Sequence, residues 1–322
     1  MRDLRVSQNA ARSNDLSGLP ALREGAAVVD RSRKILRLTG KDPIGMLNAV
    51  LTNDVPAQED RGAYAMLLNP KGRIQTDLRV IKAGEDILID TESEGAEAAK
   101  EILGRYAPFS RVKLEDLSDS WTVLGLYGPS AAELLGDDGL AEHQSKEIEI
   151  EGRTLLAVGV AMPVSGYDLI APAADLDAIR GCLVETGATQ AGPAAYETAR
   201  IEAGVPRFGA DFTPENFPGE TGTIDRAVSF EKGCYPGQET VARMHYRGHP
   251  NKRLYRLVVE SVEAAPGADI FQNEKTVGTI TSTAPLSVEG RILALGYLSR
   301  NANITEPLQT EDTRVHVLGA VS

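Results

Sequence analysis

Hydrophobic and polar positions between residues 26 and 230 predict strands and short helices in a repeated order. Alternation of apolar and polar residues at 34–38 indicates a strand. Asp42-Pro43 then predicts a helix that continues to about Leu51, because proline is favourable at the first helical position. The turn signal at 69–72 (NPKG) joins two strand-like segments. Further strands are expected at 63–68, 74–82, 86–90, 121–127, 147–150, 154–160 and 167–170, and further helices at 94–105, 130–136, 175–185 and 193–202. Strand, helix, strand pair, strand, helix occurs twice, which predicts two related α/β units.

The pattern changes after residue 253. Short strands are expected at 254–260, 269–271, 276–281, 292–298 and 314–318, separated by Gly, Pro and Asn. No long helix is indicated, so this part is predicted to be a small all-β barrel or sandwich. We therefore divide the chain into residues 1–240, with the two α/β units, and residues 241–322, with the all-β domain.

The stretch 230–253 (FEKGCYPGQETVARMHYRGHPNKR) stands between these two parts. It contains almost no aliphatic side chains, and its Gly and Pro residues predict a loop rather than a core helix or strand. Loops of this kind carry function on rigid scaffolds, and domain junctions often hold ligand pockets.

Composition and charge exclude several classes of protein. The 322 residues carry a net charge of −12, so a basic face for duplex nucleic acid is not expected. A local basic patch remains at Arg243, Arg247, Lys252 and Arg253. No apolar run approaches the roughly 18 residues of a membrane span, and the N-terminus lacks the apolar core of a signal peptide. With two cysteines and no disulfide framework, we expect a cytoplasmic protein. We also expect a monomer without stable nucleic-acid or membrane partners.

Cys234 is the first candidate for chemistry. A free cysteine is often a small buried hydrophobe, as we expect for Cys182 in its helix. Cys234 instead lies in a tight turn two residues after Lys232, and a neighbouring cation favours the reactive thiolate. His245 and His249 have helical spacing, but Gly248 and Pro250 argue against a helix there. We therefore expect no metal site. The isolated His143 and His316 are expected to be surface or structural residues.

Two acidic residues can each be interpreted either as solvated carboxylates or as functional groups. Glu202 ends a predicted helix, where it is either a solvated carboxylate or a partner for two hydrogen bonds from an amidine-like edge such as that of a pterin. Asp77 lies inside a predicted strand, either on its wet face or as a functional acid.

The stretch KGCYPGQE at 232–239 matches the signature of the folate-binding YgfZ family, and the residues up to Arg253 extend the match. Residues 25–322 resemble the wider T-protein (aminomethyltransferase) superfamily of the glycine cleavage system. The matching motifs are LTND at 51–54, the N-x-x-G turn at 69–72 and RIEAGVPRFGAD at 200–211.

This resemblance implies an α+β, three-domain cloverleaf of two interleaved, ferredoxin-like α/β units and a C-terminal β-barrel. Its central channel would hold tetrahydrofolate or a derivative. Glu202 would recognise the pterin ring, and Lys232, Asn53 and Arg200, all in matching motifs, are assigned to the same folate site. Cys234 would be the characteristic thiol, and Lys232 and Asp77 the further catalytic residues.

One departure from the superfamily pattern affects the expected activity. T-proteins carry an Asp-Asp doublet where this chain has Thr76-Asp77, and Arg73 replaces the second glycine of the turn. The resemblance therefore implies a tetrahydrofolate-binding accessory factor that supports iron–sulfur proteins of the [4Fe–4S] type and tRNA thiomodification, with iron–sulfur client proteins as partners. The alternatives are a folate-dependent aminomethyltransferase or demethylase, and an RNA-binding module that uses the basic patch.

Overall fold

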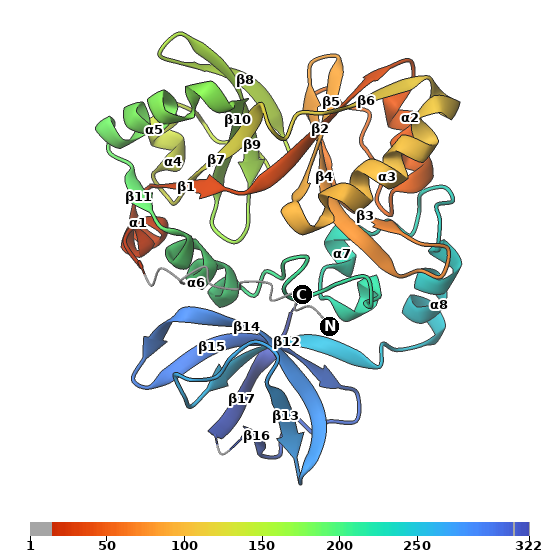
Figure 1. The fold of residues 1–322 in the computed structure, drawn as a ribbon, viewed down its shortest axis with the longest axis vertical. Coiled ribbons are helices and arrows are strands. Elements are labelled where there is room, and N and C mark those ends of the chain that lie inside the picture. The colour runs from red at the N-terminus through yellow and green to blue at the C-terminus, as the bar shows by residue number, and fades with distance from the viewer. Residues whose placement is uncertain (1–14, 312, 322) are drawn as a thin grey trace, which may run out of the picture.

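The computed structural model describes residues 15–311 and 313–321. Two α/β units and a barrel form three lobes around a central connecting segment, residues 204–251 (Figure 1). The predicted α+β fold of two interleaved α/β units and a C-terminal β-barrel is confirmed.

The first unit is a five-stranded antiparallel sheet. Its strands, in spatial order, are β3 (Ala63–Leu68), β4 (Ile74–Ala83), β5 (Asp86–Glu92), β2 (Arg33–Gly40) and β6 (Val112–Asp116). Helices α2 (Pro43–Val50) and α3 (Ala96–Tyr106) cover one face, where Leu47 and Leu103 join the same apolar cluster as Leu78. Asp42 starts α2 as the sequence predicts, since its Oδ1 accepts a 2.9 Å hydrogen bond from the Gly45 amide. The 3₁₀ turns Ser93–Gly95 and Ala107–Ser110 flank α3.

The second unit is a six-stranded sheet. Its order is β11 (Thr189–Ala191), β1 (Ala27–Arg31), β7 (Trp121–Tyr127), β10 (Gly166–Pro172), β9 (Arg153–Val160) and β8 (Ser145–Ile150), and only the β1–β11 pair is parallel. The helices of this unit are α1 (Leu19–Glu24), α4 (Ala131–Leu135), α5 (Leu176–Glu185) and α6 (Pro193–Ala203), with a 3₁₀ turn at Ala173–Asp175.

The two units are interleaved through β1 and β2. These strands are separated only by Ser32, yet β1 belongs to the six-stranded sheet and β2 to the five-stranded one. One apolar cluster spans both sheets, with Ile35 and Ile81 from one and Val123 and Ile170 from the other. The sheets are therefore packed as one body, and side chains near Ser32 lie where they meet.

The C-terminal lobe is a closed barrel, so the alternative of a sandwich is excluded. Its strands are β12 (Lys252–Val259), β13 (Asp269–Gln272), β14 (Lys275–Val288), β15 (Arg291–Ser299), β16 (Leu308–Thr310) and β17 (Thr313–Ala320). Strand β14 is much longer than the predicted 276–281, and α6 packs against it. This contact attaches the barrel to the α/β units.

The connecting segment corrects one prediction. It contains a 3₁₀ turn (Pro218–Glu220), α7 (Ile224–Ala227) and α8 (Gln238–Arg247), and α8 lies in the stretch 230–253 that the sequence predicts to be a loop. Helix α8 forms with few aliphatic residues because Val241 is buried while Gln, Glu and Arg, which are good helix formers, face solvent. The predicted domain boundary at 240/241 falls inside α8, and the first barrel strand begins at Lys252.

Within the described ranges no helix has the length and apolar character needed to cross a membrane.

Candidate functional site

An open pocket lies where the two sheets meet α6 and the connecting segment. Its walls are rich in charged and phenolic side chains, unlike the apolar clusters that surround it. The residues that line it are Arg31, Arg33, Tyr64, Asp77, Arg79, Glu92, Glu142, His143, Gly159, Val160, Met162, Pro163, Asp168, Tyr196, Arg200, Val205, Pro206, Arg207, Thr223 and Arg226.

Asp77 is the acid of this pocket that lacks a cationic partner. Strand β4 places it there, with 8% of the residue exposed. Its Oδ2 accepts a 2.8 Å hydrogen bond from the Tyr64 hydroxyl, whereas its buried Oδ1 has no hydrogen-bond partner among the described residues. Burial, opposed by Arg33 and reinforced by Glu92, raises the pKa of Asp77 from 3.8 to about 6. The structure thus places a carboxyl group that titrates near neutrality, with a free oxygen, at a pocket wall.

The raised pKa of Asp77 predicts a pH-dependent stability difference. The folded state holds the Asp77 proton more tightly than the unfolded chain, so this contribution is complete below about pH 4 and is lost as the pH rises through about 6. At about 1.4 kcal/mol per pH unit, the loss is at most about 3 kcal/mol. We expect Asp77→Asn to gain stability relative to the native protein between pH 4 and pH 7, measured by urea unfolding. A stability difference that does not change with pH would contradict the raised pKa.

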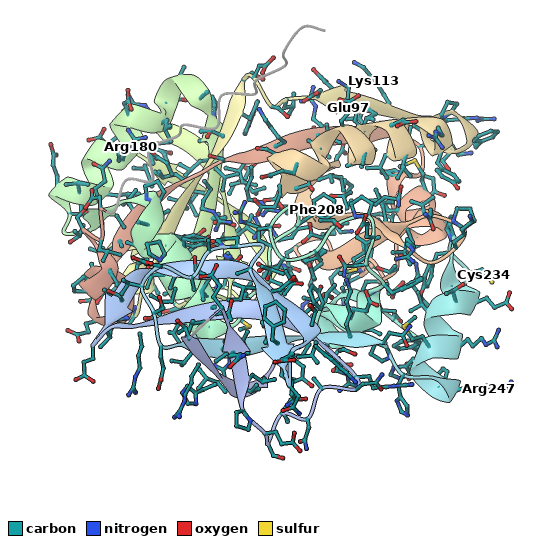
Figure 2. All side chains as sticks on the ribbon, turned by 60° about the horizontal axis from the view of Figure 1, so that its bottom comes forward. Glu97, Lys113, Arg180, Phe208, Cys234 and Arg247 are labelled. Carbon is teal, nitrogen blue, oxygen red and sulfur yellow. The ribbon has the colours of Figure 1, made fainter. Side chains whose placement is uncertain are left out.

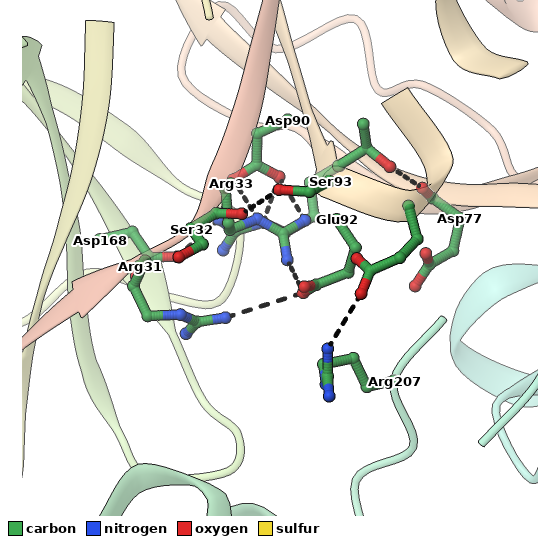
Figure 3. Close-up of polar contacts among 12 residues, drawn as sticks. Arg31, Ser32, Arg33, Asp77, Asp90, Glu92, Ser93, Asp168 and Arg207 are labelled. Carbon is green, nitrogen blue, oxygen red and sulfur yellow. Dashed lines mark hydrogen bonds and ion pairs between the residues drawn. The ribbon is translucent and has the colours of Figure 1, made fainter. Parts of the chain in front are cut away.

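Other acids in the pocket wall and next to it are neutralised by arginines (Figure 3). Arg33 donates two hydrogen bonds to Asp90 at 2.8 and 2.9 Å and one to Glu92 at 2.5 Å. Arg79 pairs with both Asp90 and Asp168. Burial alone would raise the pKa of Asp90, but Arg33 and Arg79 hold it below its ordinary value. These ion pairs therefore use the carboxylates of Asp90, Glu92 and Asp168 and do not include Asp77.

Arg200 lines the pocket but uses all its hydrogen-bond donors inside the protein. A guanidinium group has five N–H donors. The structure gives Arg200 five bonds: two to Glu197, one each at 2.6 Å to the Val205 carbonyl and to Asp211, and one at 3.0 Å to Ser282 on β14. A folate contact would require one of these bonds to break.

Glu202 lies on a different face of α6 from Arg200. Its carboxylate forms an ion pair with Arg23 of α1, and its side chain is 28% exposed. It does not line the pocket that contains Asp77. The structure therefore does not bring the predicted pterin-binding acid together with Asp77.

Asn53 and Lys232 join the connecting segment to the first unit. The Asn53 amide nitrogen donates at 2.9 Å to the carbonyls of Tyr64 and Arg226. The Lys232 ammonium donates to the carbonyls of Asn48 and Leu51, at 2.8 and 2.6 Å, and so caps the C-terminus of α2. Neither side chain lines the pocket, so both motif residues have structural contacts in this fold.

The contacts of Lys232 predict a loss of stability when it is replaced. Lys232→Met leaves the carbonyls at the end of α2 without their charged donor, which is expected to cost about 1–2 kcal/mol. Urea unfolding measures this loss, and Lys41→Met, at an exposed position before α2, is the control. A Lys232→Met protein with native stability and no folate-dependent activity would instead indicate the catalytic role predicted from the sequence.

Cys234 is exposed at the outer edge of the molecule beside α8 (Figure 2). The loop around it is anchored on both sides: Tyr235 is buried in an apolar cluster, and Gly237 adopts φ +80° against the turn at 69–72. A Cβ at Gly237 would lie 2.5 Å from the Asn69 carbonyl, which explains the glycine. The thiol is thus held on a fixed loop, but it does not line the pocket. Cys182, predicted to be a buried core residue, is partly buried and packs against the core of the second unit.

The residues that the structure describes contain no group of three or more His, Cys, Asp and Glu able to hold a metal ion. His245 lies within α8, contrary to the predicted loop, and stacks on Phe230 at 4.0 Å between ring centroids. His249 follows the end of the helix. In the basic patch, Arg243, Arg247 and Arg253 are exposed, and the Lys252 ammonium lies 4.5 Å from the centroid of the Tyr297 ring.

Several pocket residues were missed by the sequence reasoning. Tyr64 and Tyr196 belong to a strand and a helix whose patterns gave no reason to single them out. His143 was expected to be a surface or structural residue, yet it lines the same pocket as Asp77. A pattern along one strand or helix carries no signal for a pocket that is assembled from several elements.

Comparisons with known proteins agree with this architecture. Residues 16–232, more than half of the chain, match the family described as GCVT N-terminal domain. An aminomethyltransferase of Thermus thermophilus is 30% identical over 302 residues, covering 90% of this chain and 84% of the relative. A tRNA-modifying protein YgfZ of Pectobacterium atrosepticum is 27% identical, covering 85% and 84%. The structure of the glycine cleavage system aminomethyltransferase T of Bartonella henselae superimposes with a TM-score of 0.80 at 23% identity, covering 93% of this chain and 87% of that one, and so shares its fold.

The two kinds of relative match at similar identity over similar lengths, so they place the chain in the superfamily without selecting one branch. The three-lobed fold, the matched residues and the relatives agree: this chain belongs to the GCVT (aminomethyltransferase-like) family.

Proposed function

We propose that this protein binds tetrahydrofolate in the pocket that contains Asp77 and acts as an accessory factor for iron–sulfur enzymes, with Cys234 as its working thiol. The folate part rests on membership of the GCVT family and on the pocket itself. The accessory part rests on the KGCYPGQE signature and on one observation, the exposure of Cys234 outside the pocket on an anchored loop.

The pocket has the chemical groups that a reduced folate requires. A pterin ring carries N–H donors along one edge, and the free Oδ1 of Asp77 is a buried acceptor that needs a donor. The Tyr196 ring, whose centroid lies 4.2 Å from the Arg31 guanidinium carbon, is an aromatic part of the same pocket wall. These features support binding of a planar, donor-rich ligand.

The position of Cys234 favours a reaction with another macromolecule. An exposed thiol can reach a partner protein, whereas a thiol inside the pocket would face only a small ligand. Since Lys232 and Gly237 fix the loop on both sides of Cys234, the thiol is presented in one defined position. This arrangement fits a protein that acts on iron–sulfur clients.

Cys234→Ala tests the accessory function directly. We expect the variant to fold with native stability and to bind tetrahydrofolate normally, because the side chain is exposed and lies outside the pocket. In a strain that lacks the native gene, it is expected not to restore the activity of [4Fe–4S] enzymes. Cys182→Ala, with its thiol packed against a core, is the matched control. Full restoration by Cys234→Ala would remove the accessory role of this thiol.

A second candidate function, folate-dependent one-carbon transfer, is favoured by Asp77. A carboxyl group with a pKa of about 6 is suited to exchange protons at neutral pH. Purified protein with tetrahydrofolate and an aminomethyl donor would then release methylene-tetrahydrofolate. Absence of turnover, with folate binding intact, would contradict this activity and leave the accessory function standing.

A further inference from the structure

His143 is a titratable residue of the pocket that the proposed function does not use. It precedes β8 and lines the pocket together with Asp77, Tyr64 and Arg226. Its side chain is only 17% exposed. The sequence around His143 gives no reason for a largely buried imidazole at a pocket wall.

The backbone fixes His143 in an unfavourable conformation. Its φ is +63°, in the left-handed region that costs a non-glycine residue on the order of 1 kcal/mol. Two hydrogen bonds hold it there: its amide donates to the Gly159 carbonyl at 3.0 Å, and its carbonyl accepts from the Gly62 amide at 2.9 Å. Gly159 belongs to the six-stranded sheet and Gly62 immediately precedes the five-stranded one. The ring is therefore positioned by both units.

The ring makes no hydrogen bond with the described residues. Nδ1 is buried without a partner, and Nε2 lies 3.9 Å from Oε1 of Glu142, a carboxylate that pairs with Arg226. Burial, reinforced by Arg79 and Arg226 and opposed by Glu142 and Asp90, lowers the pKa of His143 from 6.5 to about 4. At neutral pH the imidazole is therefore uncharged. The carboxylate beside Nε2 favours the proton on that nitrogen, which leaves Nδ1 as an acceptor.

We propose that His143 is a binding residue of the pocket, whose Nδ1 accepts a hydrogen bond from an N–H or O–H group of the ligand held beside Asp77. This inference rests on the proposed function. The two groups are both hydrogen-bond acceptors for one ligand. Asp77 offers a carboxyl oxygen from β4, and His143 offers an uncharged nitrogen from the segment before β8. The class of ligand that satisfies both is a neutral, multi-donor heterocycle, as a reduced pterin is.

Imidazole NMR with tetrahydrofolate as the probe tests this inference. The chain has four histidines, so a sample labelled with ¹⁵N-histidine gives four rings, which single His→Gln variants assign. At saturation with tetrahydrofolate we expect the Nδ1 resonance of His143 to move in the direction of a newly accepted hydrogen bond. The rings of His245, His249 and His316 are expected to stay in place, because none lines this pocket.

A calorimetric titration measures how much this hydrogen bond contributes to tetrahydrofolate binding. Loss of one neutral hydrogen bond is expected to weaken tetrahydrofolate binding by roughly 3–10-fold in His143→Phe, whereas His316→Phe, at a half-exposed barrel position, is expected to bind as the native protein does. Tetrahydrofolate that binds without moving the His143 resonance would overturn this inference alone. A native protein that does not bind tetrahydrofolate would overturn the proposed function together with it.

Discussion

Asp77→Asn is expected to lower the one-carbon transfer proposed as the second candidate function by about 10²–10⁴-fold, the usual contribution of a positioned acid or base. Asparagine keeps the shape of the side chain and can still accept the hydrogen bond from Tyr64. It cannot take up or release a proton, so the variant removes the group that titrates near pH 6 while keeping the pocket intact. The measurement is the initial rate of methylene-tetrahydrofolate release, with kcat and KM determined separately.

The proposed role of Asp77 as a titrating group also predicts the result of a control variant and of a pH series. Asp225→Asn changes an exposed carboxylate on α7 and is expected to leave the rate unchanged. As the pH rises through about 6, the native protein is expected to gain this proposed activity if ionised Asp77 acts as a base, or to lose it if protonated Asp77 acts as an acid. An active native protein whose Asp77→Asn variant turns over at the native rate would exclude Asp77 from the chemistry.

Arg200→Leu is expected to destabilise the protein by about 3–5 kcal/mol, because it leaves a buried carboxylate without its cation. The Asp211 side chain is fully buried and lies 2.6 Å from Arg200. With Arg200 removed, Asp211 keeps hydrogen bonds to Thr281, Ser282 and the Arg207 amide, none of which carries a charge. Because these contacts link α6 to the barrel strand β14, the loss of stability is expected to weaken attachment of the barrel. Urea or thermal unfolding measures the loss.

Two further variants distinguish the loss of the buried Arg200–Asp211 ion pair from the general effect of removing an arginine. Arg105→Leu removes an exposed ion pair with Glu101 and is expected to cost less than about 1 kcal/mol. Arg200→Leu combined with Asp211→Asn removes both charges, and the double variant is expected to be more stable than Arg200→Leu alone. Equal stability of the single and double variants would show that the pair is not the source of the effect.

Much of the fold was accessible from the sequence, because its strands and helices bury one face each and their patterns record it. The helix at 43–50 begins at its predicted cap, and the barrel strands follow the predicted Gly, Pro and Asn breaks. Helix α8 was predicted wrongly because only Val241 buries a side chain fully, so its polar residues resemble a loop. Strand β16, three residues long, is too short to produce a pattern.

The candidate site was less accessible for a different physical reason. Motif residues stood out in the sequence whether their contacts were structural or chemical, so Lys232 and Asn53 were assigned to folate although they hold backbone carbonyls. Asp77 stands out in the sequence because it occupies one position of the Asp-Asp doublet of the superfamily. Its missing cation and the nearby His143 depend on contacts between segments far apart in the chain, and no local pattern reports such contacts.

A crystal structure of the protein with bound tetrahydrofolate tests whether the pocket that contains Asp77 is the folate site. We expect pterin density in the pocket between the two sheets, with a ring N–H group within hydrogen-bond distance of Asp77 Oδ1 and with Cys234 still exposed outside the pocket. Pterin density at the Cys234 loop or at Glu202, with the Asp77 pocket filled only by water, would contradict it.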